Sequence, residues 1–195
     1  MPFVKPNPTR RPPVKVKPVH FSVLGALGLA ACGGGGGGTT PTDGDSGSSS
    51  GISLTGDVVK GPVSNALVFV DYNNDGLLSP GEPSQRTDAN GNFEFIDLEA
   101  EGPIVAITDG ASVDTSTGLV ISGMLLTAPE GSTVISPLTT LMQQANLTSA
   151  EVASALNLTS GIDLTSYNPF ASGTDADTAL AVEIAAQQVS AVSRG

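Results

Sequence analysis

The stretch that decides the fold is residues 66–96, ALVFVDYNNDGLLSPGEPSQRTDANGNFEFI. It opens with five apolar residues, continues through a run rich in Asp, Asn, Gly and Pro, and ends in an alternating run at residues 92–96. A short continuous apolar run favours a strand buried in a core, whereas alternation favours a half-buried strand. Asn90-Gly91 predicts a tight reversal before the second strand, because both residues tolerate positive φ.

Similar short runs occur on both sides of this stretch. Residues 52–59 begin as an alternating run that Lys60-Gly61-Pro62 ends, and further apolar runs occupy residues 104–108 and 119–126. Five or six short strands, separated by turn residues at roughly ten-residue spacing, are typical of an all-β sandwich. We therefore expect a mainly β domain over residues 52–133, a small antiparallel β-sandwich of the immunoglobulin-like kind.

Residues 71–82, DYNNDGLLSPGE, fit the pattern D-x-[DN]-x-[DN]-G-x₅-E of a twelve-residue calcium loop at every constrained position. Calcium takes six to eight oxygen ligands, which alternate residues of a tightly curled loop can supply. Gly76 occupies the sharp turn, and the apolar Leu78 is expected to anchor the loop to the core. The predicted ligands of Ca²⁺ are side-chain oxygens of Asp71, Asn73 and Asp75, the backbone carbonyl of Leu77, Ser79 directly or through water, and the carboxylate of Glu82.

The surroundings of this loop differ from those of an EF-hand. The segment before it is strand-like, and Pro80 and Pro83 prevent a helix from starting directly after it. With three carboxylates and no second loop, we expect a calcium affinity of about 10⁻⁴ to 10⁻³ M. The alternative is a polar turn that binds no ion, since Asp, Asn and Gly favour turns in any case.

Residues 52–109 resemble the SdrD B-like and Cna-B-like modules of bacterial surface proteins. The matching motifs are Gly56-Asp57-Val58-Val59, the 71–82 loop with Glu82-Pro83, and Thr87-Asp88-x-x-Gly91-x-Phe93. The resemblance implies a prealbumin-like β-sandwich. It also implies that Asp71, Asn73, Asp75 and Glu82 bind calcium, which in those proteins rigidifies stalks carrying adhesive domains. Asp88 lies in the matching turn but is not expected to be a ligand.

The N-terminal residues 1–31 have the features of an export signal. A basic segment at residues 10–17 precedes eleven mostly apolar residues at 21–31, which are too few to span a bilayer as a helix. Leu29-Ala30-Ala31-Cys32 resembles the bacterial lipobox, which implies cleavage before Cys32 and a diacylglycerol anchor on its thiol. An ordinary signal peptide with a leftover cysteine is the alternative. Gly33, rather than Asp, follows the cysteine, and in lipoproteins of diderm bacteria this implies the outer membrane.

Residues 32–51 comprise the predicted lipidated cysteine and a tether. Six consecutive glycines are followed by Thr, Pro, Asp, Gly and Ser, a composition that cannot bury apolar surface, so we expect disorder. About 18 such residues span about 23 Å on average and about 60 Å at full stretch. The folded part can therefore stand clear of the lipid headgroups.

The charged residues exclude several functions. Of 19 acidic and 8 basic residues in the chain of 195, five basic residues and the single histidine lie within residues 1–31. The mature chain, strongly acidic, is a poor partner for nucleic acid or anionic lipids and a good one for divalent cations. Without histidine it has no Ser-His-Asp triad, Cys-His pair or zinc site of the usual ligands. We expect that the protein is not an enzyme. Catalysis by a pair of carboxylates is the one type of reaction chemistry that the composition leaves open.

The composition changes at about residue 134, and residues 134–195 are alanine-rich and helical in pattern. Ser136-Pro137 predicts a helix start, because serine caps helices and proline suits the first helical position. Two further starts are predicted by the capping boxes Thr148-x-x-Glu151 and Thr174-x-x-Asp177. The second precedes a helix expected over residues 175–192. Its stripe of Val182, Ala185, Ala186, Val189 and Val192 is interpreted as core packing, with a partner-binding face as the alternative.

Together these features indicate a calcium-binding, lipid-anchored protein of the bacterial outer membrane or cell surface. It would act as a structural or adhesive module, attached to the membrane through Cys32, with a protein or glycan of the host surface or the envelope as its ligand. The alternative function is a non-catalytic accessory lipoprotein that binds a peptide or glycan, in which the Asp/Asn loop is only a turn.

Overall fold

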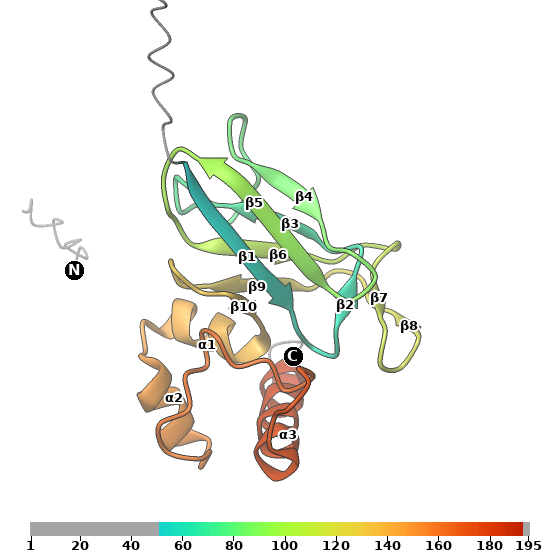
Figure 1. Ribbon diagram of the computed structural model, residues 1–195, viewed down its shortest axis with the longest axis vertical. Helices are drawn as coiled ribbons and strands as arrows, with labels where there is room; N and C mark the ends of the chain where they lie inside the picture. Colours follow the sequence, from blue (N-terminus) through green and yellow to red (C-terminus); the bar gives the residue numbers. More distant parts are fainter. Residues whose placement is uncertain (1–50, 193–195) are drawn as a thin grey trace, which may run out of the picture. The chain divides into compact units, whose positions relative to one another are not determined.

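The computed structural model describes residues 51–192, which form three small, mostly antiparallel sheets followed by three helices (Figure 1). The predicted signal peptide, Cys32 and nearly all of the predicted tether lie outside the described residues. The strands are β1 (Ile52–Val58), β2 (Val63–Ser64), β3 (Leu67–Val70), β4 (Ser84–Arg86), β5 (Asn92–Leu98), β6 (Ile104–Ile107), β7 (Val113–Asp114), β8 (Leu119–Val120), β9 (Leu125–Ala128) and β10 (Val134–Ile135). The helices are α1 (Pro137–Ala145), α2 (Ser149–Ala155) and α3 (Ala176–Val192). The predicted order of strands followed by helices is thus confirmed.

The three sheets have the strand orders β10-β1-β5, β2-β7-β8 and β4-β3-β6-β9. All pairs are antiparallel except β1 with β10, which run parallel with Asp57 opposite Val134. Strand β1 is central in its sheet, because one of its edges pairs with β10 and the other with β5. The pairing with β5 runs from Ile52 opposite Leu98 to Asp57 opposite Asn92. A strand that lies far along the chain, β10, therefore completes the sheet that β1 begins.

The burial of the strands follows their sequence patterns. In β5, Phe93 and Phe95 are buried while Asn92 and Glu94 are exposed, as alternation predicts for a strand with one solvated face. In β3, Val68, Phe69 and Val70 are all fully buried, as a continuous apolar run predicts for a strand covered on both faces.

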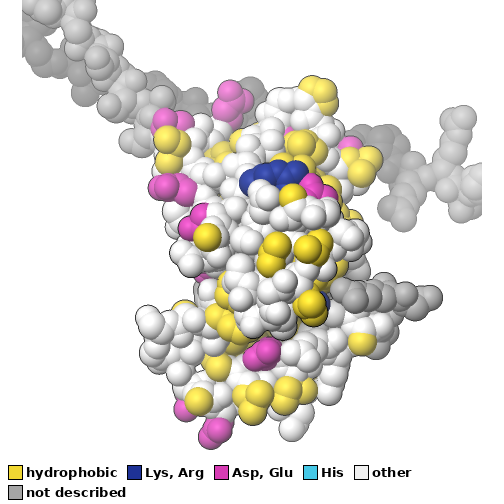
Figure 2. Space-filling model, turned by 90° about the vertical axis from the view of Figure 1, so that its right-hand side faces the viewer, with side chains coloured by type: hydrophobic (Ala, Val, Ile, Leu, Met, Phe, Trp, Pro, Cys, Tyr) yellow, Lys and Arg dark blue, Asp and Glu magenta, His cyan; other side chains and the backbone are white. Residues whose placement is uncertain are grey.

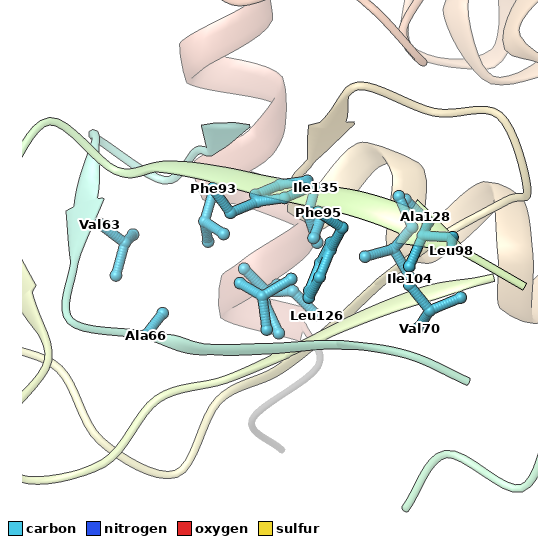
Figure 3. Packing of buried hydrophobic residues seen from close by; sticks show 13 residues of the cluster. Val63, Ala66, Val70, Phe93, Phe95, Leu98, Ile104, Leu126, Ala128 and Ile135 are labelled. Atoms are coloured by element: carbon cyan, nitrogen blue, oxygen red, sulfur yellow. The ribbon is translucent and has the colours of Figure 1, made fainter. Parts of the chain in front are cut away.

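The main hydrophobic core is formed by the strands (Figure 3). Its buried side chains come from both larger sheets: Val58, Phe93, Phe95, Leu98 and Ile135 from one, and Val68, Val70, Ile104, Ala106, Leu126 and Ala128 from the other. The rings of Phe93 and Phe95 lie 5.9 Å apart at a tilt of 52°, within the range of favourable aromatic pairs. Burying these side chains together supplies the dominant stabilising term of the strand region.

Of two local predictions, one was wrong in detail and the other was confirmed. The run at residues 119–126 is not one strand, because the chain turns at Gly123 (φ +74°) and separates β8 from β9. The reversal at Asn90-Gly91 forms, with Gly91 at φ +87° and its N–H donating to the carbonyl of Asp88 at 3.1 Å. It does not make a hairpin, however, because the strands it joins, β4 and β5, belong to different sheets.

The predicted helix starts are largely confirmed. Ser136 caps α1 and forms a capping box with Thr139, and Thr148 forms one with Glu151 at the start of α2. The start of α3 differs, because the carboxylate of Asp175 rather than the hydroxyl of Thr174 accepts the backbone N–H of Thr178, at 2.9 Å. An Asp side chain reaches the free N–H groups of the first turn as well as Thr does.

The helices share a second hydrophobic core with the segments between them. Val182 and Ala185 of α3 are buried against Leu138, Met142 and Val152, with Ala186 and Val189 packed at the edge. Core packing is therefore confirmed for these four residues of the predicted stripe. No helix within residues 51–192 is long and apolar enough to cross a membrane.

The helices attach directly to the strands, and in Figure 1 they lie on the side of β9 and β10. The hydroxyls of Thr139 and Thr140 both donate to the carbonyl of Thr127 in β9, at 3.0 and 3.2 Å. The side chain of Asn168 donates to Asp57 of β1 at 3.0 Å. The sequence predicted a boundary between a β domain ending at residue 133 and a helical region starting at residue 134. Strand β10 follows this boundary directly, so the predicted helical region contributes one strand to the sheet β10-β1-β5.

Candidate metal site

The predicted calcium loop connects β3 to β4, with its base held by backbone hydrogen bonds. The N–H of Asp71 donates to the carbonyl of Pro103 at 2.9 Å, and the N–H of Val70 donates to the carbonyl of Pro83 at 3.2 Å. Residues 71–83 contain no helix. The prediction that this loop lies between strands, with no helix entering or leaving it, is confirmed.

Asp71 organises the first half of the loop from a buried position, with only 2% of its surface exposed. Its two carboxylate oxygens accept the backbone N–H groups of Asp75, at 3.1 Å, and of Gly76, at 2.8 Å. Gly76 has φ +75°, and no heavy atom lies within 4 Å of where its Cβ would be. The glycine is therefore required by the backbone conformation of the turn and not by lack of space.

The other predicted ligands are joined to the same network. The side chain of Asn73 accepts from the N–H of Asp75 at 3.0 Å and donates to the carboxylate of Asp75 and the hydroxyl of Ser79, at 3.0 and 3.2 Å. Asp75 accepts the N–H of Leu77 at 2.8 Å. Four predicted ligands are thus linked within the space of seven residues.

Glu82 closes the loop. One of its carboxylate oxygens accepts the N–H of Tyr72 at 3.0 Å, and the other accepts the N–H of Ser79 at 2.8 Å. The last predicted ligand is therefore connected to the residue after the first. A glutamate at this position does more than occupy a turn, because its two oxygens hold both ends of the loop together.

The donor chemistry of the loop suits a hard cation. All predicted ligands are oxygens, and three of them are carboxylates, which is the donor set that calcium prefers. Among residues 51–192 the one ion pair joins Arg86 and Asp109, at 2.5 Å, so no basic side chain is paired with the loop carboxylates. Over the face seen in Figure 2, acidic side chains are spread widely, whereas dark blue is almost confined to one spot, since residues 51–192 contain only two basic residues, Lys60 and Arg86.

The three carboxylates of the loop do not yet share one coordination sphere. No group of three or more His, Cys, Asp or Glu side chains in residues 51–192 is close enough together to hold a metal ion. Each carboxylate has about four acceptor positions, so one that accepts a backbone N–H retains capacity for an ion. A calcium ion held by this loop would require Asp71, Asp75 and Glu82 to lie closer together, while their hydrogen bonds could be kept.

The expectation that Leu78 anchors the loop was wrong. Leu78 is 41% exposed and its neighbour Leu77 is 66% exposed. Anchoring comes instead from Tyr72, which packs against the strand core, and from the segment Gly102-Pro103. A Cβ on Gly102 would lie 3.3 Å from the carbonyl oxygen of Asp71, so this glycine allows the two segments to approach closely. The Gly-Pro pair before the apolar run at residue 104 is the sequence signal that could have indicated this contact.

Asp88 has a local role. Its carboxylate accepts the backbone N–H groups of Asn90 and Asn92, both at 2.8 Å, and the side-chain amide of Asn92 at 2.9 Å. These hydrogen bonds, with the backbone N–H of Asn92 foremost, keep the pKa of Asp88 below its usual value. The residue therefore stabilises the turn between β4 and β5.

A shallow polar groove of about 730 Å³ lies between β1, β4 and β5. Asp57, Arg86, Asn92 and Glu94 are among its lining residues, and the side chain of Gln85 crosses from β4 to donate to the carbonyl of Glu94. Carboxylate, amide and guanidinium groups in one groove can form hydrogen bonds with a peptide or a glycan.

The chain matches no family model, no curated protein and no solved structure. The resemblance of residues 52–109 to SdrD B-like and Cna-B-like modules therefore stays a prediction.

Proposed function

We propose that this protein is a calcium-binding, lipid-anchored protein of the bacterial outer membrane or cell surface, in which the strand region serves as a structural or adhesive module. The observation that carries the proposal is the loop at residues 71–82. Its oxygen ligands Asp71, Asn73, Asp75, Ser79 and Glu82 are held in one hydrogen-bonded network without a basic partner.

Calcium would act by stabilising the fold. Three carboxylates within twelve residues repel one another, and a divalent cation between them converts this repulsion into attraction. Because the loop joins β3 to β4 and is bonded to Pro103 just before β6, the ion would fix the relative positions of three strands of one sheet. We propose that this sheet and the sheet β10-β1-β5 pack as a prealbumin-like sandwich, which the shared core of Phe95, Leu126 and their neighbours supports.

A second candidate is the non-catalytic accessory lipoprotein that binds a peptide or glycan. The polar groove between β1, β4 and β5 favours it, as does the fact that backbone N–H groups already satisfy the loop carboxylates. In that case the loop is a completed turn and calcium has no effect on stability. No catalytic role is proposed in either case.

Thermal unfolding separates the two candidates. The mature chain, with Cys32→Ser to remove the lipid, is melted in EDTA and in 5 mM calcium, together with Glu82→Ala and the control Glu130→Ala, which removes an exposed carboxylate outside the loop. If the dissociation constant is about 10⁻⁴ M, one-site linkage predicts about 2.3 kcal/mol of added stability, a rise of several degrees in Tm.

We expect this calcium-induced rise in the parent and in Glu130→Ala, and its loss in Glu82→Ala. The comparison is made within each variant, because removing Glu82 also leaves the N–H groups of Tyr72 and Ser79 without their acceptor. If the parent shows no rise, the loop is only a turn, and ligand screening of the polar groove is the next step.

A further inference from the structure

Two adjacent leucines stand out at the tip of the candidate calcium loop. Leu77 is 66% exposed and Leu78 is 41% exposed, although the polar side chains around them are engaged in the network within the loop. Two large apolar side chains exposed next to each other form a surface that is available for an apolar contact. The position of the loop in the fold indicates which apolar partner this surface contacts.

The loop and the start of β1 lie at the same end of the strand region. Ile52, the first residue of β1, pairs with Leu98, the last of β5. The short turn that follows β5 leads to Ile104, which pairs with Val70, the residue just before the loop. In addition, the N–H of Asp71 donates to the carbonyl of Pro103 in that turn. Figure 1 shows the start of β1 and the loop between β3 and β4 at one end of the sheets.

We propose that Leu77 and Leu78 contact the lipid surface to which the chain is anchored. This inference rests on the proposed lipid anchor at Cys32. About 18 residues separate Cys32 from the start of β1. If they form the flexible linker that their composition predicts, the effective concentration of the folded part at the membrane is on the order of millimolar. A contact too weak to hold a free protein is populated under these conditions. Apolar side chains at the surface of a bilayer insert into the boundary between headgroups and acyl chains.

The charge at this end selects the kind of lipid. Exposed carboxylates of Asp97, Glu99 and Glu101 lie in and next to the turn after β5, near the loop with its own three carboxylates. The two basic residues of the described part, Lys60 and Arg86, lie toward the other end, beyond the end of β1 and opposite Leu67, the first residue of β3. An anionic surface would be repelled, so the contact is with zwitterionic lipids, and calcium in the loop strengthens it by reducing the repulsion between loop and headgroup phosphates.

A second exposed apolar pair provides the control. Leu119 and Val120 of β8 are 64% and 61% exposed. Strand β8 pairs with β7 and β7 with β2, which follows the end of β1 rather than its start. This pair therefore lies at the end away from the tether. If exposure alone brought apolar residues to the membrane, both pairs would contact it equally, whereas a tether attached at the start of β1 favours Leu77 and Leu78.

The composition of the chain permits a direct test. The chain has no tryptophan and a single cysteine, Cys32. The mature chain is coupled through the Cys32 thiol to a maleimide lipid in phosphatidylcholine vesicles, which supplies the anchor chemically. It carries either Leu78→Trp, next to but not among the predicted ligands, or the control Val120→Trp. Tryptophan fluorescence is then measured with and without brominated phosphatidylcholine, in EDTA and in calcium. The Tm of each variant is compared with that of the parent to verify folding.

We expect a blue-shifted emission and quenching by the brominated lipid for Leu78→Trp, with stronger quenching in calcium, and much weaker effects for Val120→Trp. Equal quenching in EDTA and in calcium supports the membrane contact and contradicts only the effect of calcium on it. Quenching of both variants to the same extent overturns the inference, because the tether then selects no end. An unquenched Leu78→Trp variant whose Tm still rises with calcium overturns the membrane contact and leaves the calcium site intact.

Discussion

Gly56 in β1 is the position at which a single methyl group should do most damage to the connection between strands and helices. A Cβ at residue 56 would overlap the carbonyl oxygen of Thr133 and lie 2.7 Å from Cζ of Phe93 and 2.9 Å from the carbonyl carbon of Thr133. Ordinary contacts of a Cβ lie between 3.4 and 4 Å. Because the obstacle is backbone, a change of side-chain rotamer cannot relieve it.

The expected cost of Gly56→Ala follows from what must move. The backbone at Thr133 has to separate from β1, and the N–H of Asp57 then loses its hydrogen bond of 2.8 Å to the carbonyl of Thr133. Overpacking costs about 1–3 kcal/mol and a lost hydrogen bond about 0.5–1.5 kcal/mol, together about 2–4 kcal/mol. For a folded part of this size, this corresponds to a fall in Tm of about 8–16 °C.

The assay is thermal unfolding followed by circular dichroism, with Gly110→Ala as the matched control. No heavy atom lies within 4 Å of where a Cβ of Gly110 would be, and its φ is not in the left-handed region. We expect Gly110→Ala to change the stability by no more than about 1 kcal/mol, in either direction. The reasoning is refuted if Gly56→Ala melts within about 2 °C of the parent, which is about 0.5 kcal/mol, or if both substitutions lower the Tm equally.

Three other predictions concern the helices and the response to acid. Leu138→Ala should lower the free energy of unfolding by about 2–5 kcal/mol, because this side chain is 1% exposed in the helical core, whereas denaturant unfolding of Leu180→Ala, at 56% exposure, should show almost no change. Thr148→Ala should cost about 1 kcal/mol in the same assay through loss of the α2 cap, and a cost near zero would contradict the capping box. Hydrogen bonds in the folded state, led by those from the backbone N–H groups of Asn92 and Thr148, lower the pKa of Asp88 and of Glu151. Their contribution to stability should therefore be complete above their usual pKa values, about 4, and be lost as the pH falls through the lower folded values, so that a Tm independent of pH between 6 and 2.5 would contradict it.

The candidate site was predictable because its signals are local. The Asp, Asn and Glu residues of the loop are spaced so that each reaches a backbone N–H two to ten residues away in the chain. Gly76 adopts positive φ at the position where the pattern requires a turn. The role of Leu78 was not predictable in the same way, because whether an apolar residue of a loop is buried depends on which distant segment covers it. That place is taken by Tyr72 at the base of the loop.

The helix caps show the same contrast. Ser136 and Thr148 act within three residues of their partners, so their motifs were sufficient to locate α1 and α2. At α3, two candidate caps, Thr174 and Asp175, are adjacent, and the sequence pattern alone favoured the wrong one. The choice was made by the direction in which the preceding segment enters, where the hydroxyl of Thr174 donates instead to the carbonyl of Ala171 at 2.9 Å.

By itself, the sequence determined the strands β1, β3, β5 and β6, the starts of α1 and α2 and the turn at Gly76 in the acidic loop, because these features depend on alternation, capping and turn residues over a few positions. The tertiary structure alone decided that β4 and β5 enter different sheets, that β10 pairs in parallel with β1 and that Asn168 reaches Asp57, 111 residues away. It also placed Leu77 and Leu78 on the surface at the end where β1 begins. Pairing between distant segments depends on which combination buries the most apolar surface while satisfying every buried backbone group, and no local pattern contains that comparison.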